Sequence, residues 1–205
     1  MNNNWSEIPN DEIVLKTIEN LKSRGFNVIL VKTKSEALSV IKKLIPSGSE
    51  VMNGSSTTLN EIGYTDLLKS GNHSWKNLHV EILKEPDKNK QADLRRKSAC
   101  SEYFLASVNA ISMNGELVAC DASGSRVTAF PNAAKNLVLV AGIQKITDNL
   151  ELAMKRVREY VFPLENERAK KAYGMGSNTS KWVILEKEFT PNRINLILVK
   201  EKLGF

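Results

Sequence analysis

The stretch FNVILVKTKSEALSVIKKLIPSGSEVMN, residues 26–53, contains the pattern that decides the fold. Residues 26–31 are mainly apolar and β-branched, as in a buried strand. Thr33 and Glu36 then form a capping box, which predicts that a helix follows. A Ser-Gly turn leads to a second short strand over residues 50–53. A strand–helix–strand unit with a right-handed crossover predicts a parallel sheet.

The remaining residues continue this alternation. Residues 137–141, LVLVA, indicate a central parallel strand because the apolar run is unbroken, and Asn114-Gly115 predicts a β-hairpin. Other helices are expected at residues 12–25, 58–61, 64–70, 92–106, 148–160 and 163–173, other strands at 79–83, 107–112, 116–119, 182–185 and 194–199, and a charged loop at 85–91. We therefore expect an α/β fold with a mainly parallel sheet flanked by helices, in one domain of residues 11–205 after a tail of residues 1–10.

The composition is that of an ordinary globular domain. Hydrophobic residues make up 41% of the chain and charged residues 25%, which excludes a low-complexity or disordered class. No run of about 18 apolar residues occurs, so no transmembrane helix is expected. The polar N-terminus has neither the basic nor the apolar segment of a signal peptide, so a cytoplasmic protein is the default expectation.

The charged residues favour a small anionic ligand. The formal net charge is +6, but basic residues alternate with acidic ones and form no aromatic-interleaved stripe. This pattern does not favour nucleic acid as a partner. Cys100 and Cys120 do not form a C-x-x-C pair, and His73 and His79 are the only histidines. We therefore expect no metal site and no iron–sulfur cluster.

The first candidate site is the loop in VMNGSSTTLNEIG, residues 51–63. Gly54 is followed by four hydroxyl residues, namely Ser55, Ser56, Thr57 and Thr58. At a strand-to-helix turn, a glycine allows close approach of a ligand, and free backbone N–H groups and hydroxyls can bind an anion. In the alternative interpretation, these residues only make the turn and cap the helix. The loop is not a Walker loop, because no Gly-Lys-Ser/Thr follows.

The second candidate site lies in SVNAISMNGELVACDASGSRVTAF, residues 107–130. Asn109, on an otherwise apolar strand, either satisfies backbone groups or faces a ligand. Arg126, at a Gly-Ser helix start, suits a phosphate or carboxylate because its guanidinium can donate to two oxygens at once. In the alternative interpretation, Arg126 pairs with Asp121 as a structural clasp. Glu116 is a candidate nucleophile or base if it is buried, and a solvated residue otherwise.

These stretches resemble the LUD domain family, the LutC/YkgG-like lactate-utilisation proteins. The resemblance covers most of the chain from about Asp11 onward, with its motifs in the same order. It is carried by VMNGSSTTLNEIG, SVNAISMNGELVACDASGSRVTA, KNLVLVAGIQKITDNLELAMKRVRE and PNRINLILVKEKLGF.

The resemblance implies a fold like that of the NagB/RpiA/CoA-transferase superfamily, whose members bind sugar phosphates, CoA esters or folates. It implies a role in oxidising lactate to pyruvate, alongside iron–sulfur or flavin-containing subunits. The candidate ligand-binding positions are Gly54, Ser55, Ser56, Thr57, Glu61, Asn109, Asn114, Gly115, Leu117, Gly124, Ser125 and Arg126. Glu116 and Asp121 are the candidate catalytic residues. Fold alone does not determine an activity.

One departure from the family concerns cysteine. Relatives often carry several cysteines between the long helix and the last strands, whereas PLENERAKKAYGMGSNTSKWVIL, residues 163–185, has none. Three functions therefore stay open at this point. The chain is a non-redox subunit that binds an anionic metabolite, an isomerase- or transferase-type enzyme acting on a sugar phosphate, CoA thioester or folate, or a scaffold subunit without a ligand. The oligomeric state, including a homo-oligomer, is also open.

Overall fold

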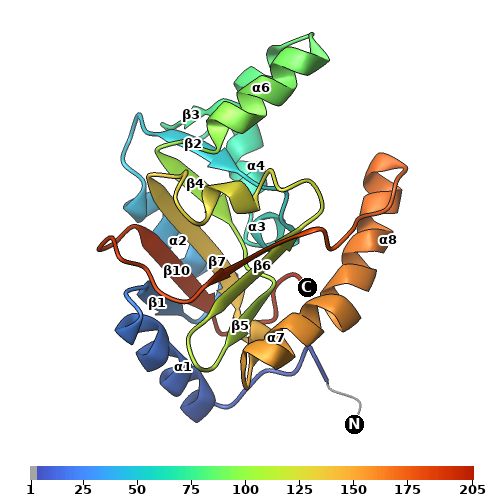
Figure 1. Cartoon of the computed structure of the whole chain (residues 1–205). Helices are drawn as coiled ribbons and strands as arrows, with labels where there is room; N and C mark the ends of the chain where they lie inside the picture. The colour runs from blue at the N-terminus through green and yellow to red at the C-terminus, as the bar shows by residue number, and fades with distance from the viewer. Residues whose placement is uncertain (1–3) are drawn as a thin grey trace.

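A computed structural model describes residues 4–205 of the chain, so residues 1–3 of the expected tail lie outside the described residues. Its central element is a six-stranded sheet in the order β1-β10-β7-β4-β2-β3, with every neighbouring pair parallel (Figure 1). The strands are β1 (Asn27–Val31), β2 (Glu50–Asn53), β3 (Lys76–Asn77), β4 (Tyr103–Ala106), β7 (Asn136–Gly142) and β10 (Ile194–Val199). The expected α/β fold with a mainly parallel sheet is confirmed.

The middle strand β7 shows why its sequence is continuously apolar. Leu137 and Leu139 belong to the core on one face of the sheet, and Val138 and Val140 belong to the core on the other face. Both faces of a parallel sheet are covered, so every position along the strand is buried.

One face of the sheet is covered by three helices, α2 (Lys34–Leu44), α3 (Thr57–Glu61) and α4 (Tyr64–Ser70). Thr33 caps α2 by accepting a hydrogen bond from the backbone N–H of Glu36 at 3.3 Å. Ser56 caps α3 in the same way, through the N–H of Leu59 at 3.2 Å. Helix α3 begins directly after the loop at Gly54.

The other face is covered by α1 (Asp11–Ser23) and a second sheet in the order β8-β5-β6-β9. Its strands are β5 (Ala110–Ser112), β6 (Leu117–Asp121), β8 (Ile146–Thr147) and β9 (Lys181–Leu185). Strands β5 and β6 are antiparallel, with Ile111 opposite Leu117, which confirms the hairpin at Asn114-Gly115.

Helix α7 (Leu150–Arg156), a π-helical turn (Val157–Val161) and α8 (Phe162–Tyr173) form one continuous helical run beside the second sheet (Figure 1). Ala153 and Val157 of this run pack against Ala110 and Val118 of the sheet. Among residues 4–205, no helix is both long and apolar enough to span a membrane.

Two expected elements were wrong. The strand expected at residues 79–83 is helix α5 (Leu78–Lys84), because Asn77 caps it and Leu78 and Ile82 share one helical face. The helix expected at residues 92–106 is α6 (Lys88–Ser98), which begins within the expected charged loop.

Helix α6 begins early because the Asp87 carboxylate accepts the N–H groups of Asn89 and Lys90. The end of the expected helix is strand β4, which pairs with β2 and β7. Residues 107–109 of the next expected strand form a loop between β4 and β5.

Candidate functional site

Three loops meet at one edge of the large sheet. Strands β2, β4 and β7 are parallel neighbours, and each is followed by polar residues at its carboxyl end. These are Ser55 and Ser56 after β2, Ser107 and Asn109 after β4, and Lys145 after β7. Ligands of open α/β sheets bind at this edge.

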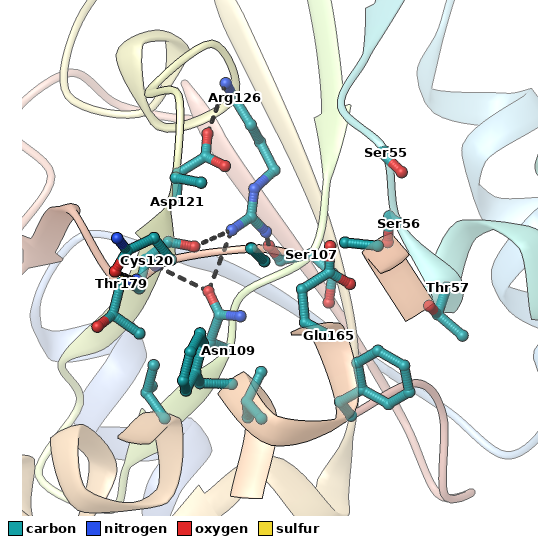
Figure 2. Close-up of a pocket in the computed structure, with 18 of the residues that line it drawn as sticks. Ser55, Ser56, Thr57, Ser107, Asn109, Cys120, Asp121, Arg126, Glu165 and Thr179 are labelled. Carbon is teal, nitrogen blue, oxygen red and sulfur yellow. Dashed lines mark hydrogen bonds between the residues drawn. The ribbon is translucent and has the colours of Figure 1, made fainter. Parts of the chain in front are cut away.

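The three loops line a cleft of about 370 Å³, which is large enough for a small organic molecule. Ser55, Ser56 and Thr57 lie on one polar side, across the opening from Asn109 and Asp121 (Figure 2). The apolar part of the lining comes from the α7–α8 run and the segments after it. Its apolar members are Val157, Val161, Phe162, Ala169, Tyr173, Met175 and Phe205.

Arg126 fixes the polar side of the cleft. Its guanidinium donates to the carbonyl oxygen of Ser107 at 2.8 Å, to Asn109 Oδ1 at 3.1 Å and to the carbonyl oxygen of Cys120 at 2.6 Å (Figure 2). The side chain therefore ties the end of β4 to the end of β6. These three contacts within the protein use much of the hydrogen-bonding capacity of the Arg126 guanidinium.

The clasp between Asp121 and Arg126 takes a different form from the one expected. Asp121 Oδ2 accepts from the backbone N–H of Arg126 at 3.0 Å and of Val127 at 3.4 Å, not from the guanidinium. The carboxylate thus caps the short 3-10 turn Val127–Ala129. The helix expected after Gly124 is only this turn.

The two candidate loops touch each other at Gly54. A Cβ atom at this position would lie 2.6 Å from Cγ and 2.8 Å from Cδ of Arg126. The absence of a side chain therefore allows Arg126 to lie against the loop after β2. The structure brings together the two regions that the sequence suggested separately.

Lys145, which the sequence analysis missed, lies at the base of the cleft and is only 3% exposed. Its Nζ lies 3.1 Å from Thr58 Oγ1, 3.0 Å from Ser107 Oγ and 3.1 Å from the carbonyl oxygen of Val108. Burial, with smaller contributions from the guanidinium groups of Arg156 and Arg126, holds the pKa of Lys145 well below its ordinary value. A signal was available, because Lys145 follows the expected central strand on its carboxyl side.

The positive charges around the cleft have no matching carboxylates. Among residues 4–205, neither Lys145 nor Arg126 nor Arg156 forms an ion pair. Arg156 Nη1 donates to the carbonyl oxygen of Asn109 at 2.6 Å, and Nη2 is buried without a hydrogen-bond partner in the described part of the chain.

The carboxylates at the rim of the cleft bind groups other than the side chains of Lys145, Arg126 and Arg156. Glu165 lines the cleft but forms a two-pronged ion pair with Arg168, at 2.7 Å for each hydrogen bond. Asp121 accepts backbone N–H groups. Buried positive charge without a partner is costly, so the site favours an anionic ligand.

The one cysteine that lines the cleft is Cys120. Burial raises the pKa of its thiol to about 11. The thiolate is the nucleophilic form of cysteine, so this thiol is unreactive at neutral pH.

Of the predicted site residues, seven line the cleft, namely Ser55, Ser56, Thr57, Asn109, Asp121, Ser125 and Arg126. Glu61 lies behind it, where its carboxylate accepts the N–H of Gly204 at 2.7 Å and holds the segment that brings Phe205 to the cleft. Gly124 has φ +89° and packs against the Lys181 side chain.

The hairpin residues lie away from the cleft. Glu116 forms an ion pair with Arg24 at 2.9 Å, and Arg24 Nε also donates to the carbonyl oxygen of Asn114. Gly115 lies against the backbone of α1 at Asn20. Because β6 runs from this turn to Asp121, the turn and the cleft are separated by roughly 15 Å of extended chain. Leu117, at the start of β6, is buried in the core.

The comparisons with known proteins agree with this architecture. A DUF162 family protein from Deinococcus radiodurans, whose crystal structure is known at 1.70 Å resolution, is similar with a TM-score of 0.54 and 11% identity, over 94% of this chain and 99% of that chain. At this identity, the similarity shows the fold alone. The delta subunit of eIF2B from Chaetomium thermophilum gives a TM-score of 0.38 with 14% identity, over 70% of this chain and 54% of that chain, which is too distant to support an argument.

No curated protein matches the chain. The family model of the LUD domain matches residues 14–199, which is nearly the whole chain. This chain belongs to the LUD domain family.

Proposed function

We propose that this protein binds a small anionic metabolite in the cleft and serves lactate utilisation as a cytoplasmic, non-redox component. The observation that carries the proposal is the pair of guanidinium groups, of Arg126 and Arg156, in or beside one cleft without an ion-pairing carboxylate among residues 4–205. A bound carboxylate or phosphate would supply the missing negative charge.

The lining of the cleft supports an organic anion as the proposed ligand. Its polar side presents hydroxyl groups and an amide, which suit oxygen atoms of a ligand. The wall formed by residues such as Val161 and Phe162 suits an apolar part of the same molecule. At about 370 Å³, the space fits a metabolite rather than a macromolecule.

Lactate and pyruvate are candidates because of the family to which the chain belongs. In this proposal the oxidation itself takes place on iron–sulfur or flavin-containing partner subunits. The present chain would bind substrate, product or a regulatory metabolite of that process. Sugar phosphates, CoA thioesters and folates are the alternative ligands.

A thermal-shift series tests the proposal. Lactate, pyruvate, sugar phosphates, CoA esters and folates are added to the purified protein, and a ligand of the folded state raises the melting temperature in a concentration-dependent manner. We expect at least one anion to do so. The shift should shrink in Ser55→Ala, whose hydroxyl lines the cleft, and persist in Ser39→Ala, an exposed serine on α2.

If no compound of the panel raised the melting temperature, this result would contradict metabolite binding. That outcome would favour the scaffold function, in which the loops at the sheet edge are only turns. The next step would then be a search for a protein partner.

A further inference from the structure

The side chain of Lys145 is the least expected group in the cleft. A lysine that is buried for structural reasons has a carboxylate partner as a rule. Here the neighbours of Nζ are two hydroxyl oxygens, of Thr58 and Ser107, and the carbonyl oxygen of Val108. The charged groups that influence its pKa are two guanidinium groups, of Arg156 and Arg126, which lower it, and the more weakly acting carboxylate of Glu61, which raises it.

No carboxylate in the described part of the chain accepts a hydrogen bond from Nζ, and this favours a neutral amine over an ammonium ion in a buried place. A neutral amine has two hydrogens and one lone pair. It can donate to the carbonyl oxygen of Val108 and to Ser107 Oγ, while the Thr58 hydroxyl turns from the carbonyl oxygen of Leu203, to which it donates at 3.5 Å, and donates to the lone pair. Burial, together with the repulsion by the two guanidinium groups, lowers the pKa of the amine in the same direction. A neutral amine is the nucleophilic form of lysine.

The geometry points to Lys145 as a catalytic nucleophile that adds to the carbonyl carbon of a small anionic aldehyde or ketone, such as a 2-oxo acid or a phosphorylated sugar in its open form. This inference rests on the proposed function, because it assigns the anion site a reacting group. It goes further by requiring that the ligand carries a carbonyl group as well as a negative charge. The charge would lie near Arg126 and Arg156, with the carbonyl over Lys145.

The reaction balances with the groups at hand. Nζ forms a bond to the carbonyl carbon, and the carbonyl oxygen takes up a proton to give a carbinolamine. Loss of that oxygen as water, with the second amine hydrogen, leaves an imine between Lys145 and the substrate carbon. The hydroxyls of Ser107 and Thr58, both in contact with Nζ, are placed to pass the protons between nitrogen and oxygen. No oxidant or reductant is consumed.

The pH at which the amine of Lys145 becomes neutral and reactive can be measured without any ligand. The protein is acetylated with trace acetic anhydride over a range of pH, and each lysine is quantified by peptide mass spectrometry. The rate at Lys145 should level off at a lower pH than the rates at Lys42 and Lys171, which are exposed. A pH profile for Lys145 that coincides with those of the exposed lysines would overturn the inference.

Imine formation is tested by trapping in the full-length protein. Sodium cyanoborohydride is added with pyruvate or with glyceraldehyde 3-phosphate, and it reduces an imine to a stable secondary amine. The adduct should appear at Lys145 and should saturate with concentration, whereas adducts at Lys42 should rise linearly. Acetone, a carbonyl compound without charge, should give no saturable adduct.

The outcomes separate this inference from the proposed function. An anion that raises the melting temperature while its carbonyl analogues leave Lys145 unmodified would overturn the inference and leave anion binding intact. Modification confined to exposed lysines would also overturn it. In Lys145→Arg, whose guanidinium cannot form a reducible imine, the saturable adduct should disappear, whereas it should persist in the control variant Lys42→Arg at an exposed position.

Discussion

At the residue scale, the cleft depends on a few close contacts between distant parts of the sequence. Gly54 leaves room for Arg126, and the guanidinium of Arg126 ties together the carbonyl of Ser107 and the side chain of Asn109. Gly54 directly follows β2, Ser107 directly follows β4, and Asn109 directly precedes β5. The strands therefore determine the positions of these groups, and small changes in side-chain volume should displace them.

The change Gly54→Ala tests this contact. The new methyl group would lie within 3 Å of Arg126 Cγ, whose side chain is held by several hydrogen bonds. We expect a loss of about 1–3 kcal/mol in the free energy of unfolding, as for other overpacked sites. Urea denaturation measures it.

A double-mutant cycle identifies the cause. In the Arg126→Ala background most of the obstructing side chain is absent, so Gly54→Ala should cost much less. An equal cost in both backgrounds would show that the glycine is required for its backbone and not for space.

Lys145 gives the protein a characteristic dependence of stability on pH. Its pKa is lowered in the folded state by burial, Arg156 and Arg126, partly opposed by Glu61, and returns toward 10.5 on unfolding. Between the two values the unfolded chain binds more protons than the folded protein. The free energy of unfolding should therefore rise with pH through this window. The destabilising contribution of Lys145 should vanish above about pH 10.5, where the amine is neutral in both states.

The variant Lys145→Met isolates this effect. The difference in stability between the wild type and the variant should change with pH between neutral and pH 10, measured by urea denaturation at each pH. The raised pKa values of Tyr64 and Cys120 affect both proteins alike and cancel. A difference that stays constant with pH would mean that Lys145 remains protonated in the folded protein.

At the element scale, the apolar wall of the cleft depends on the run that begins at α7. Asn149 caps this helix by accepting the N–H of Leu152 at 2.9 Å, and the helix carries Arg156 to the carbonyl of Asn109. The run continues through the π-helical turn into α8 without a break. The start of α7 therefore helps to position residues far along the run.

A pair of matched caps tests this dependence. Asn10 caps α1 with the same geometry, through the N–H of Ile13 at 2.9 Å, but it lies away from the cleft residues. Asn149→Ala and Asn10→Ala should each lower the free energy of unfolding by about 1 kcal/mol. Only Asn149→Ala should also weaken ligand binding in a titration. Equal effects on binding would contradict a role of the α7–α8 run in the cleft.

The sequence predicts a helix or strand well when the residues that determine it lie within that element. The unit from residue 26 to residue 53 was predictable because its cap, its periodicity and its turn all lie within it. Strand β4 was missed because only four residues, Tyr103–Ala106, are extended, directly after a charged helix. Its strand character comes from pairing with β2 and β7, which a local pattern does not reveal.

At the scale of the whole molecule, the cleft lies between the edge of the large sheet and the helical run beside the second sheet (Figure 2). The loops after β2 and β6 were recognisable as separate polar motifs. Their contact through Gly54 and Arg126 joins a loop of the large sheet to a loop of the second sheet, and Lys145, after β7, reaches Thr58 and Ser107. No local sequence pattern reveals these contacts. The same topology explains why Glu116, five positions before Asp121, lies at the far end of β6 beside Arg24.

The central claim is that the cleft binds an organic anion because its own positive charge is unmatched. The most direct test is a calorimetric titration of the wild-type protein with the carboxylate that gives the largest thermal shift, for example lactate, and with its uncharged amide. The account predicts that the carboxylate binds and that the amide binds at least about tenfold more weakly, because the amide cannot neutralise the guanidinium groups of Arg126 and Arg156. Equal affinity for the two compounds, or binding of the amide alone, would contradict the account.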